Sequence, residues 1–511
     1  WFSDKEFSRF IRFMRLMAQK IIWFSSEDNR EQTYLKYWLD FYLCQAFKDP
    51  TKPVRDSWND EPLFTGWLLR FVKRAIARRD LSFVYSLQKG SKRAWPALGE
   101  IKEKQALDKH KDRLLTATWT IPEDINQEIF RVSEFMFKDI VSGKAKLTKF
   151  MPTGSACLQA SRRDGGALSL CSHFQMPLET VEATKIGKLP VLSTRLNTWR
   201  KSEFDKVLLR AERRVTDEDS SGFIPGRDVE VVAIPEPGKF RIITKGDGYL
   251  YSALQPLQGG MLDAWKHSYA STMLDSDLTE RIRKIDENLP ELPLWNSGDF
   301  EAATDLLNRN ATYQAFRGLR YAPFYELGRK SLFPGRVKYP DGTVSYAISG
   351  QLMGHPLSFP LLCIINLAVY RTTCRRAFDQ GLVSKSLYHK MLRNVLVNGD
   401  DILFKCTKAI YELWKVAASE VGLKVSQGKN YLSPDSCMIN SQIFRRKNGK
   451  MKRFGYLNMK LVKGTSLKEG ESESSPTQIG KDLSAMVALC RWSNCVVPAA
   501  LNRWKDDWFG P

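Results

Sequence analysis

The hydrophobic and polar positions in the first part of the chain repeat at helical spacing. Up to about residue 150, apolar residues recur every three or four positions with basic residues between them, which predicts amphipathic helices. The pattern is clearest at 7–20 and 67–79. Basic residues in this arrangement suit either a solvated helix face or contact with RNA phosphates. We therefore predict a helical N-terminal region over residues 1–150.

The pattern changes between about residues 290 and 440, where short apolar runs alternate with helical stretches. Such a mixture is typical of an α/β or α+β core. Here two apolar runs flank Asn398-Gly399, a dipeptide that favours a tight β-hairpin because both residues tolerate positive φ. The hairpin would carry Asp400 and Asp401 at its tip, where a divalent cation would relieve the repulsion of two adjacent acids. A solvated Asn-Gly-Asp-Asp turn is the alternative.

A second acidic segment precedes the hairpin. An apolar run ends at Gly298-Asp299 and a helix-forming stretch follows, which predicts Asp299 at a strand end and Asp305 early in the next helix. An acid at a strand end beside an acidic hairpin supplies a third carboxylate for two cations, and Mg²⁺ prefers oxygen ligands. The alternative is that Asp299 and Asp305 only complement a helix dipole.

Two further segments suit a phosphorylated ligand. Gly350 and Gly354 stand before a long apolar helical stretch, as in a loop that lets the backbone approach a ligand closely. Upstream, the basic residues Lys239, Arg241 and Lys245 alternate with apolar ones, so strand geometry puts Lys239 and Arg241 on one face. Cations on one face suit a triphosphate, which arginine binds with two hydrogen bonds. An ordinary exposed strand face is the alternative.

The charge balance favours a polyanionic partner. The chain has 511 residues, with 78 Lys and Arg against 57 Asp and Glu, which gives a net charge of +21. Such an excess points to nucleic acid or an anionic membrane surface, although it can also serve solubility alone. The length predicts two to four subdomains.

Cysteine spacing and hydropathy exclude other classes. The nine cysteines form no C-x-x-C pair, so no zinc-finger spacing exists and reduced thiols are expected. The longest apolar stretch, 357–370, is interrupted by Pro360 and is shorter than the about 20 residues that cross a bilayer. We therefore expect no transmembrane segment. No signal-peptide pattern stands at the start.

The order of these segments resembles that of viral RNA-dependent RNA polymerases. The pair Asp299-x₅-Asp305, the glycine-rich helix start and the Gly-Asp-Asp hairpin match their motifs A, B and C. The spacing in motif A resembles that of narnaviruses, ourmia-like viruses (botourmiaviruses) and RNA phage replicases. The resemblance covers about residues 150–450. It implies an RNA-directed RNA polymerase, a nucleotidyltransferase that replicates a positive-strand RNA genome.

The resemblance also implies roles for single residues. Asp299, Asp400 and Asp401 would hold two Mg²⁺ or Mn²⁺ ions, and Asp305 would read the ribose hydroxyls of the incoming nucleotide. Motif B is matched at five positions, Gly350, Gln351, Met353, Gly354 and Ser358. Many other viral polymerases use an Asn four residues beyond Ser358 for ribose recognition. This chain has Leu362 there, so Asn366, one helical turn later, is the candidate substitute.

Supporting motifs are also present. The segment 239–245 resembles motif F, so its Lys239, Arg241 and Lys245 would bind the nucleotide. The segment 421–430 resembles motif D, with Lys429 as the general acid for the leaving pyrophosphate, although a surface lysine is the competing interpretation. Residues 438–446 occupy the place of motif E. The segment 152–166 resembles a stretch of narnaviral and ourmia-like polymerases whose usual Glu is Gln159 here.

The implied architecture is an α+β right-hand polymerase with an antiparallel palm sheet. We predict the helical N-terminal region at 1–150, fingers at 151–290, the palm at 291–437 with some finger insertion, and the palm end with a small thumb at 438–511. A solvated loop is expected at 464–478 and a helix at 482–504. The partners would be single-stranded RNA template, nascent RNA and ribonucleoside triphosphates, in the host cytoplasm or in mitochondria.

Two other functions compete with this one. A reverse transcriptase or intron maturase shares the palm, but typically carries an aromatic and a small residue where Asn398-Gly399 stands. A non-catalytic basic RNA-binding protein explains the net charge and leaves the ordered acids unexplained. A helicase is not supported, because the chain has no G-x-x-x-x-G-K-[ST] loop.

Overall fold

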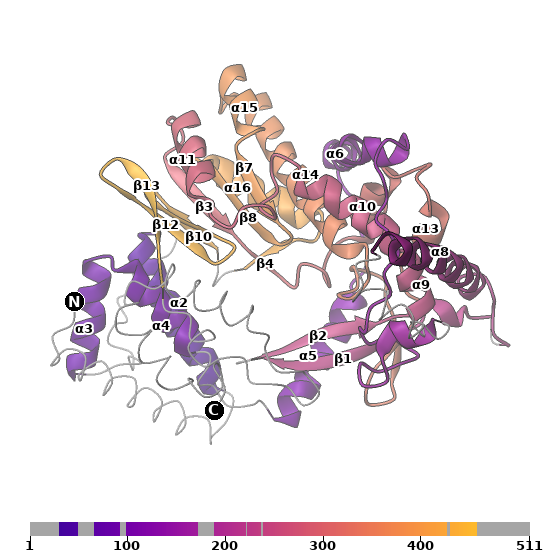
Figure 1. The fold of residues 1–511 in the computed structure, drawn as a ribbon. Helices are drawn as coiled ribbons and strands as arrows, with labels where there is room; N and C mark the ends of the chain where they lie inside the picture. Colours follow the sequence, from indigo (N-terminus) through magenta and orange to yellow (C-terminus); the bar gives the residue numbers. More distant parts are fainter. Residues whose placement is uncertain are drawn as a thin grey trace.

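The computed structural model describes residues 30–49, 66–91, 99–171, 189–220, 222–236, 239–426 and 430–456 (Figure 1). Several predictions from the sequence lie outside these ranges. They are the helix at 7–20, Lys429, the loop at 464–478, the helix at 482–504 and most of the predicted thumb. The predicted domain boundaries stay predictions.

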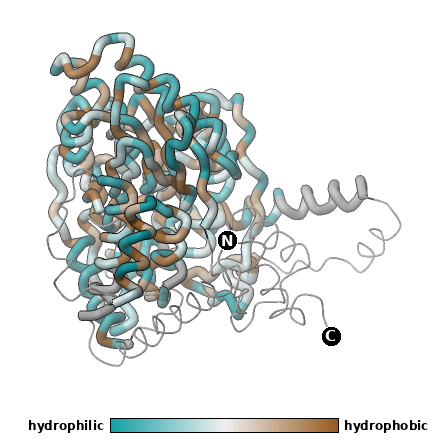
Figure 2. The backbone as a smooth tube through the Cα atoms, turned by 90° about the vertical axis from the view of Figure 1, so that its left-hand side faces the viewer, coloured by the Kyte–Doolittle hydropathy of each residue, from teal (hydrophilic) through white to brown (hydrophobic). Residues whose placement is uncertain are grey.

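The described elements before the first strand are helical. The α-helices are α2 (Arg30–Phe47), α3 (Gly66–Ala77), α4 (Leu81–Ser91), α5 (Glu100–Leu114), α6 (Glu123–Val141) and α8 (Leu189–Arg214). Two short 3₁₀ turns, η3 (Gly166–Leu170) and η4 (Pro225–Arg227), accompany them. The amphipathic pattern explains their packing: α6 buries Ile125, Ile129 and Val132, while its Phe135 is exposed. Figure 2 shows this alternation of hydrophobic and hydrophilic stretches along the chain.

The central sheet is antiparallel and has four strands. Its order is β10-β3-β8-β7, formed by β10 (Tyr431–Ser433), β3 (Leu294–Gly298), β8 (Asp401–Cys406) and β7 (Val395–Asn398). Two helices cover one face, α14 (Ser358–Asp379) and α16 (Lys408–Glu420) (Figure 1). Phe404 of β8 contacts both of them, through Tyr370 of α14 and Trp414 of α16. The antiparallel sheet predicted from the sequence is thus present.

A second four-stranded sheet lies across from the first. Its order is β2-β1-β5-β6, formed by β2 (Lys239–Lys245), β1 (Val229–Glu236), β5 (Arg336–Lys338) and β6 (Val344–Tyr346). Leu114 at the end of α5 packs against Val229 and Val337 of this sheet, and Ile242 is partly buried in the same cluster. Lys239 and Arg241 are exposed. The alternation predicted for this strand is therefore confirmed.

Two small sheets and several helices complete the described fold. The sheets are β11-β12-β13, formed by β11 (Ser436–Ile439), β12 (Gln442–Lys447) and β13 (Lys450–Phe454), and β4-β9, formed by β4 (Phe300–Glu301) and β9 (Lys424–Val425). The helices are α9 (Gly248–Ala253), α10 (Gln255–Lys266), α11 (Thr279–Asn288), α12 (Arg309–Arg317), α13 (Tyr325–Ser331) and α15 (Lys385–Met391). This mixed architecture agrees with the predicted α+β class.

The N-terminal helices pack on the last part of the described chain. Phe47 of α2 stacks on Tyr431 of β10, with ring centroids 5.1 Å apart. Arg79, between α3 and α4, forms an ion pair with Asp435 and also donates to Ser436 Oγ at 3.0 Å. These contacts join segments about 350 residues apart in the sequence, and so the helices are an integral part of the fold.

Two further findings concern the described helices and cysteines. Among the described helices, none combines the length and the apolar character needed to cross a membrane. The seven described cysteines are free thiols: Cys44, Cys157, Cys171, Cys363, Cys374, Cys406 and Cys437.

Candidate active site

Strand register brings Asp299 and Asp401 together at one end of the central sheet. The antiparallel pairing of β3 with β8 places Gly298 opposite Ile402, and the same register continued by one residue sets Asp299 opposite Asp401. A side chain on Gly298 would meet Ile402 and Trp414 on the helix-covered face. Because side chains alternate along a strand, Asp299 and Asp401 point to the other face. Asp299 is only 8% exposed, and Asp401 is half-buried.

Asp400 lies in the hairpin turn itself. Asn398 pairs with Asp401, so the two central residues of the turn are Gly399 and Asp400. Gly399 has φ 66°, whereas Asn398 and Asp400 do not adopt positive φ. The predicted hairpin is present, but its turn is shifted by one residue from Asn398-Gly399. The glycine takes the first central position, as in the hairpin turns that require positive φ only there. Asp400 is exposed as a result.

Two side chains of helix α14 hold this turn by hydrogen bonds. Asn366 is fully buried, and its side-chain amide donates a hydrogen bond of 2.9 Å to the Gly399 carbonyl. The Gly399 amide donates to Cys363 Sγ at 3.2 Å. Both backbone groups of Gly399 are thus held by one helix. The predicted role of Asn366 in nucleotide binding stays a prediction, and the contact that the structure gives it is to the acidic turn.

Asp305 lies in a turn and not in a helix. Glu301 belongs to β4, Ala302 has φ 49°, and α12 begins only at Arg309 behind the cap Asn308. The prediction of a helix directly after Asp299 is therefore wrong. The physical reason is that the carbonyls of Thr304 and Leu307 accept hydrogen bonds from a distant loop and not from a following helical turn.

That distant loop is the glycine-rich segment that resembles motif B in sequence. The Gly350 amide donates to Leu307 O at 2.8 Å and the Gln351 amide donates to Thr304 O at 2.7 Å. Gly350 has φ 86°, and a Cβ there would lie 2.6 Å from Asp305 O. Only glycine fits such a close approach. The structure therefore brings Asp305 and Gly350 into direct contact, although 45 positions separate them in the numbering.

The same loop contacts two other elements. Leu114 O, at the end of α5, accepts from the Ile348 and Ser349 amides at 2.7 and 3.0 Å. Thr244 of β2 donates its amide to Met353 O at 2.8 Å. The loop is thus held by the Asp305 turn, by an N-terminal helix and by the basic strand. This arrangement fixes the positions of the Asp305 turn, the glycine-rich loop and the basic strand relative to one another.

Ser358 and His355 stabilise the end of the loop from inside. Ser358 is buried and donates to Leu352 O at 2.9 Å. His355 Nδ1 accepts from the Leu357 amide, and its Nε2 lies 3.2 Å from Ser331 Oγ. Burial lowers the pKa of His355 to about 3. His355 is therefore a neutral ring with its proton on Nε2.

The basic strand carries its cations in ion pairs with β1. Arg241 Nε lies 2.6 Å from Glu236, Lys239 Nζ lies 3.4 Å from the same carboxylate, and Lys245 Nζ lies 2.5 Å from Glu230. Hydrogen bonds from Arg241 and the charges of both cations outweigh desolvation and lower the pKa of Glu236. Lys239 and Arg241 are exposed, and Lys245 is half-buried. An incoming polyanion would have to compete with these glutamates.

The segment that begins at Pro152 anchors the turn after the basic strand. Gln159 Oε1 accepts from the Gly248 amide at 2.8 Å, and its Nε2 donates to Asp247. Asp247 is fully buried, caps α9 and also accepts from Arg214 Nε at 2.8 Å. An amide can donate to this carboxylate and accept from a backbone amide at once. The structure thus gives Gln159 a positioning role that the sequence left open.

Arg113 is the site residue that the sequence did not reveal. It stands at the end of α5, and its guanidinium lies 3.3 Å from Glu301 Oε1 and 3.5 Å from Asp305 Oδ2. No motif surrounds it in the sequence. Arginine is common in the last turn of a helix. The contact with Asp305 in the folded structure is what identifies Arg113 as part of the site.

The donor chemistry of the three aspartates suits a hard divalent cation. Asp299 and Asp401 face the same side of the sheet, and Asp400 is exposed next to them. In the described part of the chain, no three acidic, histidine or cysteine side chains are gathered closely enough to form a ready-made metal site. Oxygen ligands at a strand end and on a tight turn are nevertheless the type that Mg²⁺ and Mn²⁺ select.

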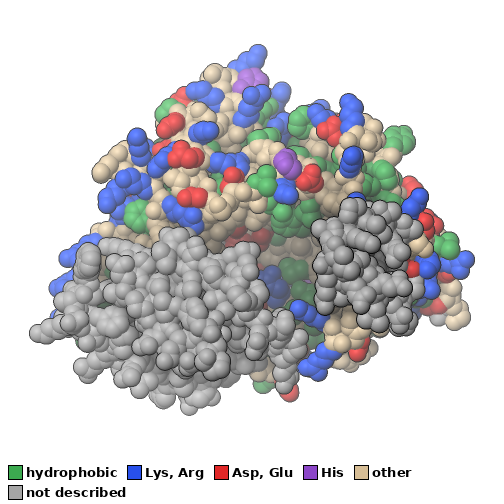
Figure 3. Space-filling view, in the orientation of Figure 1, with side chains coloured by type: hydrophobic (Ala, Val, Ile, Leu, Met, Phe, Trp, Pro, Cys, Tyr) green, Lys and Arg blue, Asp and Glu red, His purple; other side chains and the backbone are tan. Residues whose placement is uncertain are grey.

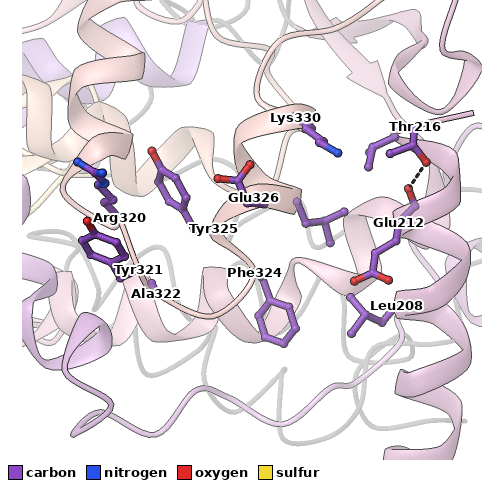
Figure 4. A pocket seen from close by; sticks show the side chains of 12 residues that line it. Leu208, Glu212, Thr216, Arg320, Tyr321, Ala322, Phe324, Tyr325, Glu326 and Lys330 are labelled. Atoms are coloured by element: carbon purple, nitrogen blue, oxygen red, sulfur yellow. Dashed lines mark hydrogen bonds between the residues drawn. The ribbon is translucent and has the colours of Figure 1, made fainter.

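The face of the molecule drawn in Figure 3 is hollowed. Figure 3 shows a hollow in the middle of that face, with acidic side chains in its depth and Lys and Arg side chains along its lower edge. A separate cavity of about 770 Å³ lies between α8 and α13 (Figure 4). It is lined by residues such as Leu208, Tyr321 and Phe324, and none of the predicted site residues lines it.

Two viral polymerases are similar in sequence to this chain. It is 26% identical over 504 residues to the RNA-dependent RNA polymerase of Ourmia melon virus (isolate Melon/Iran/VE9), which covers 88% of this chain and 56% of that protein. It is 23% identical over 374 residues to the RNA-directed RNA polymerase of the Saccharomyces 23S RNA narnavirus, which covers 68% of this chain and 38% of that protein. The chain thus spans little more than half the length of the first protein. No protein-family model matches the chain.

Solved structures give the same picture for the fold. The RNA-dependent RNA polymerase of a human picorbirnavirus superposes with a TM-score of 0.53 at 12% identity, over 95% of this chain and 89% of that one. Its insertion loop deletion mutant superposes with a TM-score of 0.55 at 12% identity, over 93% and 87%. The resemblance predicted from the sequence is therefore confirmed: the chain is related to the polymerases of an ourmiavirus and a narnavirus and has the fold of a viral RNA-dependent RNA polymerase.

Proposed function

We propose that this chain is the RNA-dependent RNA polymerase of a positive-strand RNA virus. It would copy a single-stranded RNA template by adding ribonucleotides from triphosphates to the 3′ end of the nascent RNA. The observation that carries this proposal is the meeting of Asp299 and Asp401 in strand register, beside the turn of Asp400 and close to a glycine loop that touches Asp305.

The three aspartates would hold two Mg²⁺ or Mn²⁺ ions. When bound, such a pair activates the attacking 3′-hydroxyl and stabilises the charge on the leaving pyrophosphate. What this chain contributes is a fixed ligand frame. The register of β3 against β8 sets two carboxylates, and α14 holds the turn that carries the third.

The remaining residues would bind and orient the nucleotide. Asp305 would accept hydrogen bonds from the ribose hydroxyls, with Gly350 packed against its backbone carbonyl. Lys239, Arg241 and Lys245 would bind the triphosphate by leaving their glutamate partners on β1. Lys429 would protonate the leaving pyrophosphate. Asn366 would act indirectly, by holding the turn that carries Asp400.

Location and partners follow from this function. Replication would take place in the host cytoplasm, with a mitochondrial site as the alternative. The net charge of +21 would serve to hold RNA in the hollow beside the aspartates.

The test is radiolabelled nucleotide incorporation on a single-stranded RNA template with Mg²⁺. Wild type is compared with Asp400→Ala, and ribonucleotides with deoxyribonucleotides. We expect template-dependent RNA synthesis by wild type and none by the variant. Preferred use of deoxyribonucleotides would replace this proposal with a reverse transcriptase. A folded wild type that binds RNA but incorporates nothing, even with a primer and Mn²⁺, would replace it with an RNA-binding protein.

A further inference from the structure

Four charged side chains alternate in sign across the turn that carries Asp305. Lys424 Nζ lies 3.6 Å from Glu301 Oε2, Glu301 Oε1 lies 3.3 Å from Arg113, and Arg113 lies 3.5 Å from Asp305. Asp305 and Glu301 belong to motif A, whereas Arg113 comes from α5, almost 200 residues earlier. Arg113 thus connects an N-terminal helix directly to the residue that is expected to read the sugar.

The two carboxylate oxygens of Asp305 have different partners. Oδ1 accepts a hydrogen bond of 3.1 Å from Thr304 Oγ1, and Oδ2 faces Arg113 Nη1. A carboxylate held at both oxygens has a fixed plane and fixed lone-pair directions. With Arg113 absent, Thr304 would be the one side chain in the described part of the chain left to orient this carboxylate.

The backbone of α5 makes this contact rigid. The carbonyl of Leu114, the residue next to Arg113, accepts the amides of Ile348 and Ser349 at the start of the glycine loop. Leu114 is buried against Val229 and Val337. The end of α5 is therefore fixed on two sides, and the guanidinium is presented to Asp305 from a stable support.

Arg113 is the cation that lies within ion-pair distance of Asp305. His110, one turn earlier on α5, is buried with its Nδ1 3.0 Å from Tyr339 Oη. Burial lowers the pKa of His110, which keeps the ring neutral. The side chain of Arg113 is 30% exposed and that of Asp305 is 13% exposed, so the guanidinium is the more solvent-accessible partner of the pair.

We infer that Arg113 is a positioning residue that sets the discrimination between ribose and deoxyribose by fixing the carboxylate of Asp305. This inference rests on the proposed function. A ribose 2′-hydroxyl donates to a lone pair whose direction Arg113 has set, and a deoxyribose has no such donor. Loss of Arg113 therefore lowers kcat/KM for ribonucleotides and leaves kcat/KM for deoxyribonucleotides almost unchanged.

The experiment measures kcat/KM for one ribonucleotide and its 2′-deoxy analogue on the same primed RNA template. The variants are Arg113→Ala, Arg113→Lys and Arg113→Ala/Glu301→Gln, the last of which restores the net charge of the cluster. Lys109→Ala, which removes an exposed charge from the same helix, is the control. Thermal melting checks that each variant is folded.

We expect the ribose-to-deoxyribose ratio to fall about tenfold in Arg113→Ala and in the charge-restored double variant. Arg113→Lys should give an intermediate ratio, because a single ammonium cannot reach two carboxylates as the planar guanidinium does. Lys109→Ala should keep the wild-type ratio. In an Asp305→Ala background, Arg113→Ala should change the ratio no further, since both residues act through one carboxylate.

Two results would overturn the inference while the proposed function stands. One is an Arg113→Ala enzyme whose ratio equals that of wild type, and the other is an equal loss with both nucleotides. If Arg113→Ala does not fold, a wild-type ratio in Arg113→Lys overturns it instead. A wild type without any incorporation would overturn the proposed function together with this inference.

Discussion

At the scale of single residues, the acidic turn depends on two side chains of α14. Gly399 lies between Asn398 and Asp400 in this turn. Its carbonyl accepts a hydrogen bond from Asn366, and its amide donates one to Cys363. When a buried carbonyl loses its hydrogen-bond donor, the protein loses about 1–3 kcal/mol of stability. The position of Asp400 is thus set by residues more than 30 positions earlier in the chain.

Replacing Asn366 with Leu should therefore impair catalysis more than folding. We expect incorporation to fall by about tenfold or more, because the turn that carries Asp400 loses one of its two supports. The measurement is single-turnover incorporation together with a urea unfolding curve. Thr373→Val is the matched control: Thr373 is equally buried on the same helix, but donates only to Val369 O. Similar losses in both variants would contradict this role for Asn366.

The buried ring of His355 makes stability depend on pH. Burial lowers its pKa to about 3 from the ordinary value of 6.5. Between these values the unfolded chain takes up a proton and the folded protein does not. The free energy of unfolding therefore falls as the pH decreases through this interval, by at most about 1.4 kcal/mol per pH unit from this residue.

This dependence can be isolated by substitution. His355→Gln removes the titrating group, and so its unfolding free energy should fall less steeply from pH 6.5 downward than that of wild type. Chemical denaturation at several pH values measures the slope. Thr373→Val, a substitution at a buried position without a titrating group, should keep the wild-type slope. Parallel slopes for wild type and His355→Gln would show that His355 titrates normally.

At the scale of elements, the glycine-rich loop that contains Gly350 is joined to the Asp305 turn by backbone hydrogen bonds. Its amides at Gly350 and Gln351 replace the hydrogen bonds that a helix would make at Thr304 and Leu307. The loop therefore shapes the Asp305 turn, and α12 begins only after it.

A pair of glycine substitutions tests this contact. Gly350 and Gly342 have similar φ angles, 86° and 82°, but a Cβ on Gly350 would meet Asp305 O at 2.6 Å, whereas a Cβ on Gly342 meets nothing within 4 Å. Gly342→Ala should cost about 1–2 kcal/mol of stability through φ alone and keep the activity. Gly350→Ala should cost more and lose most of the incorporation. Equal effects in stability and activity would contradict the proposed contact.

The elements that the sequence predicted are those with local signals. The strand ending at Gly298, the hairpin before Asp401, the basic strand and the helix after Gly354 all follow from periodicity and turn residues. The shifted turn at Gly399 and the late start of α12 do not, because they are set by contacts with α14 and with the glycine loop. Arg113 was not predicted for the same reason, because its partners lie almost 200 residues away in the sequence.

At the scale of the whole molecule, a large positive net charge stands beside a candidate site made of aspartates. The chain carries +21, and Figure 3 shows a hollow with acidic side chains in its depth and Lys and Arg side chains along its lower edge. Cations that contact RNA phosphates release counterions, so the affinity falls as salt increases.

RNA binding should accordingly be steeply salt-dependent, and it should not require Asp299, Asp400 or Asp401. If about five phosphates of single-stranded RNA are contacted, doubling the salt concentration should weaken binding about tenfold. Fluorescence anisotropy with labelled RNA at several salt concentrations measures the slope. Asp400→Ala should bind at least as tightly as wild type, since it removes a negative charge. A flat salt profile would contradict an electrostatic RNA channel.

The most direct measurement of the central claim is where divalent cations bind. Crystals of the protein with Mn²⁺, a primed RNA template and a non-hydrolysable ribonucleotide would be examined by anomalous diffraction. We predict two Mn²⁺ peaks between Asp299 and the Asp400-Asp401 turn, both lost in Asp299→Asn/Asp400→Asn. Bound nucleotide with no anomalous peak at these aspartates would contradict the proposed metal site.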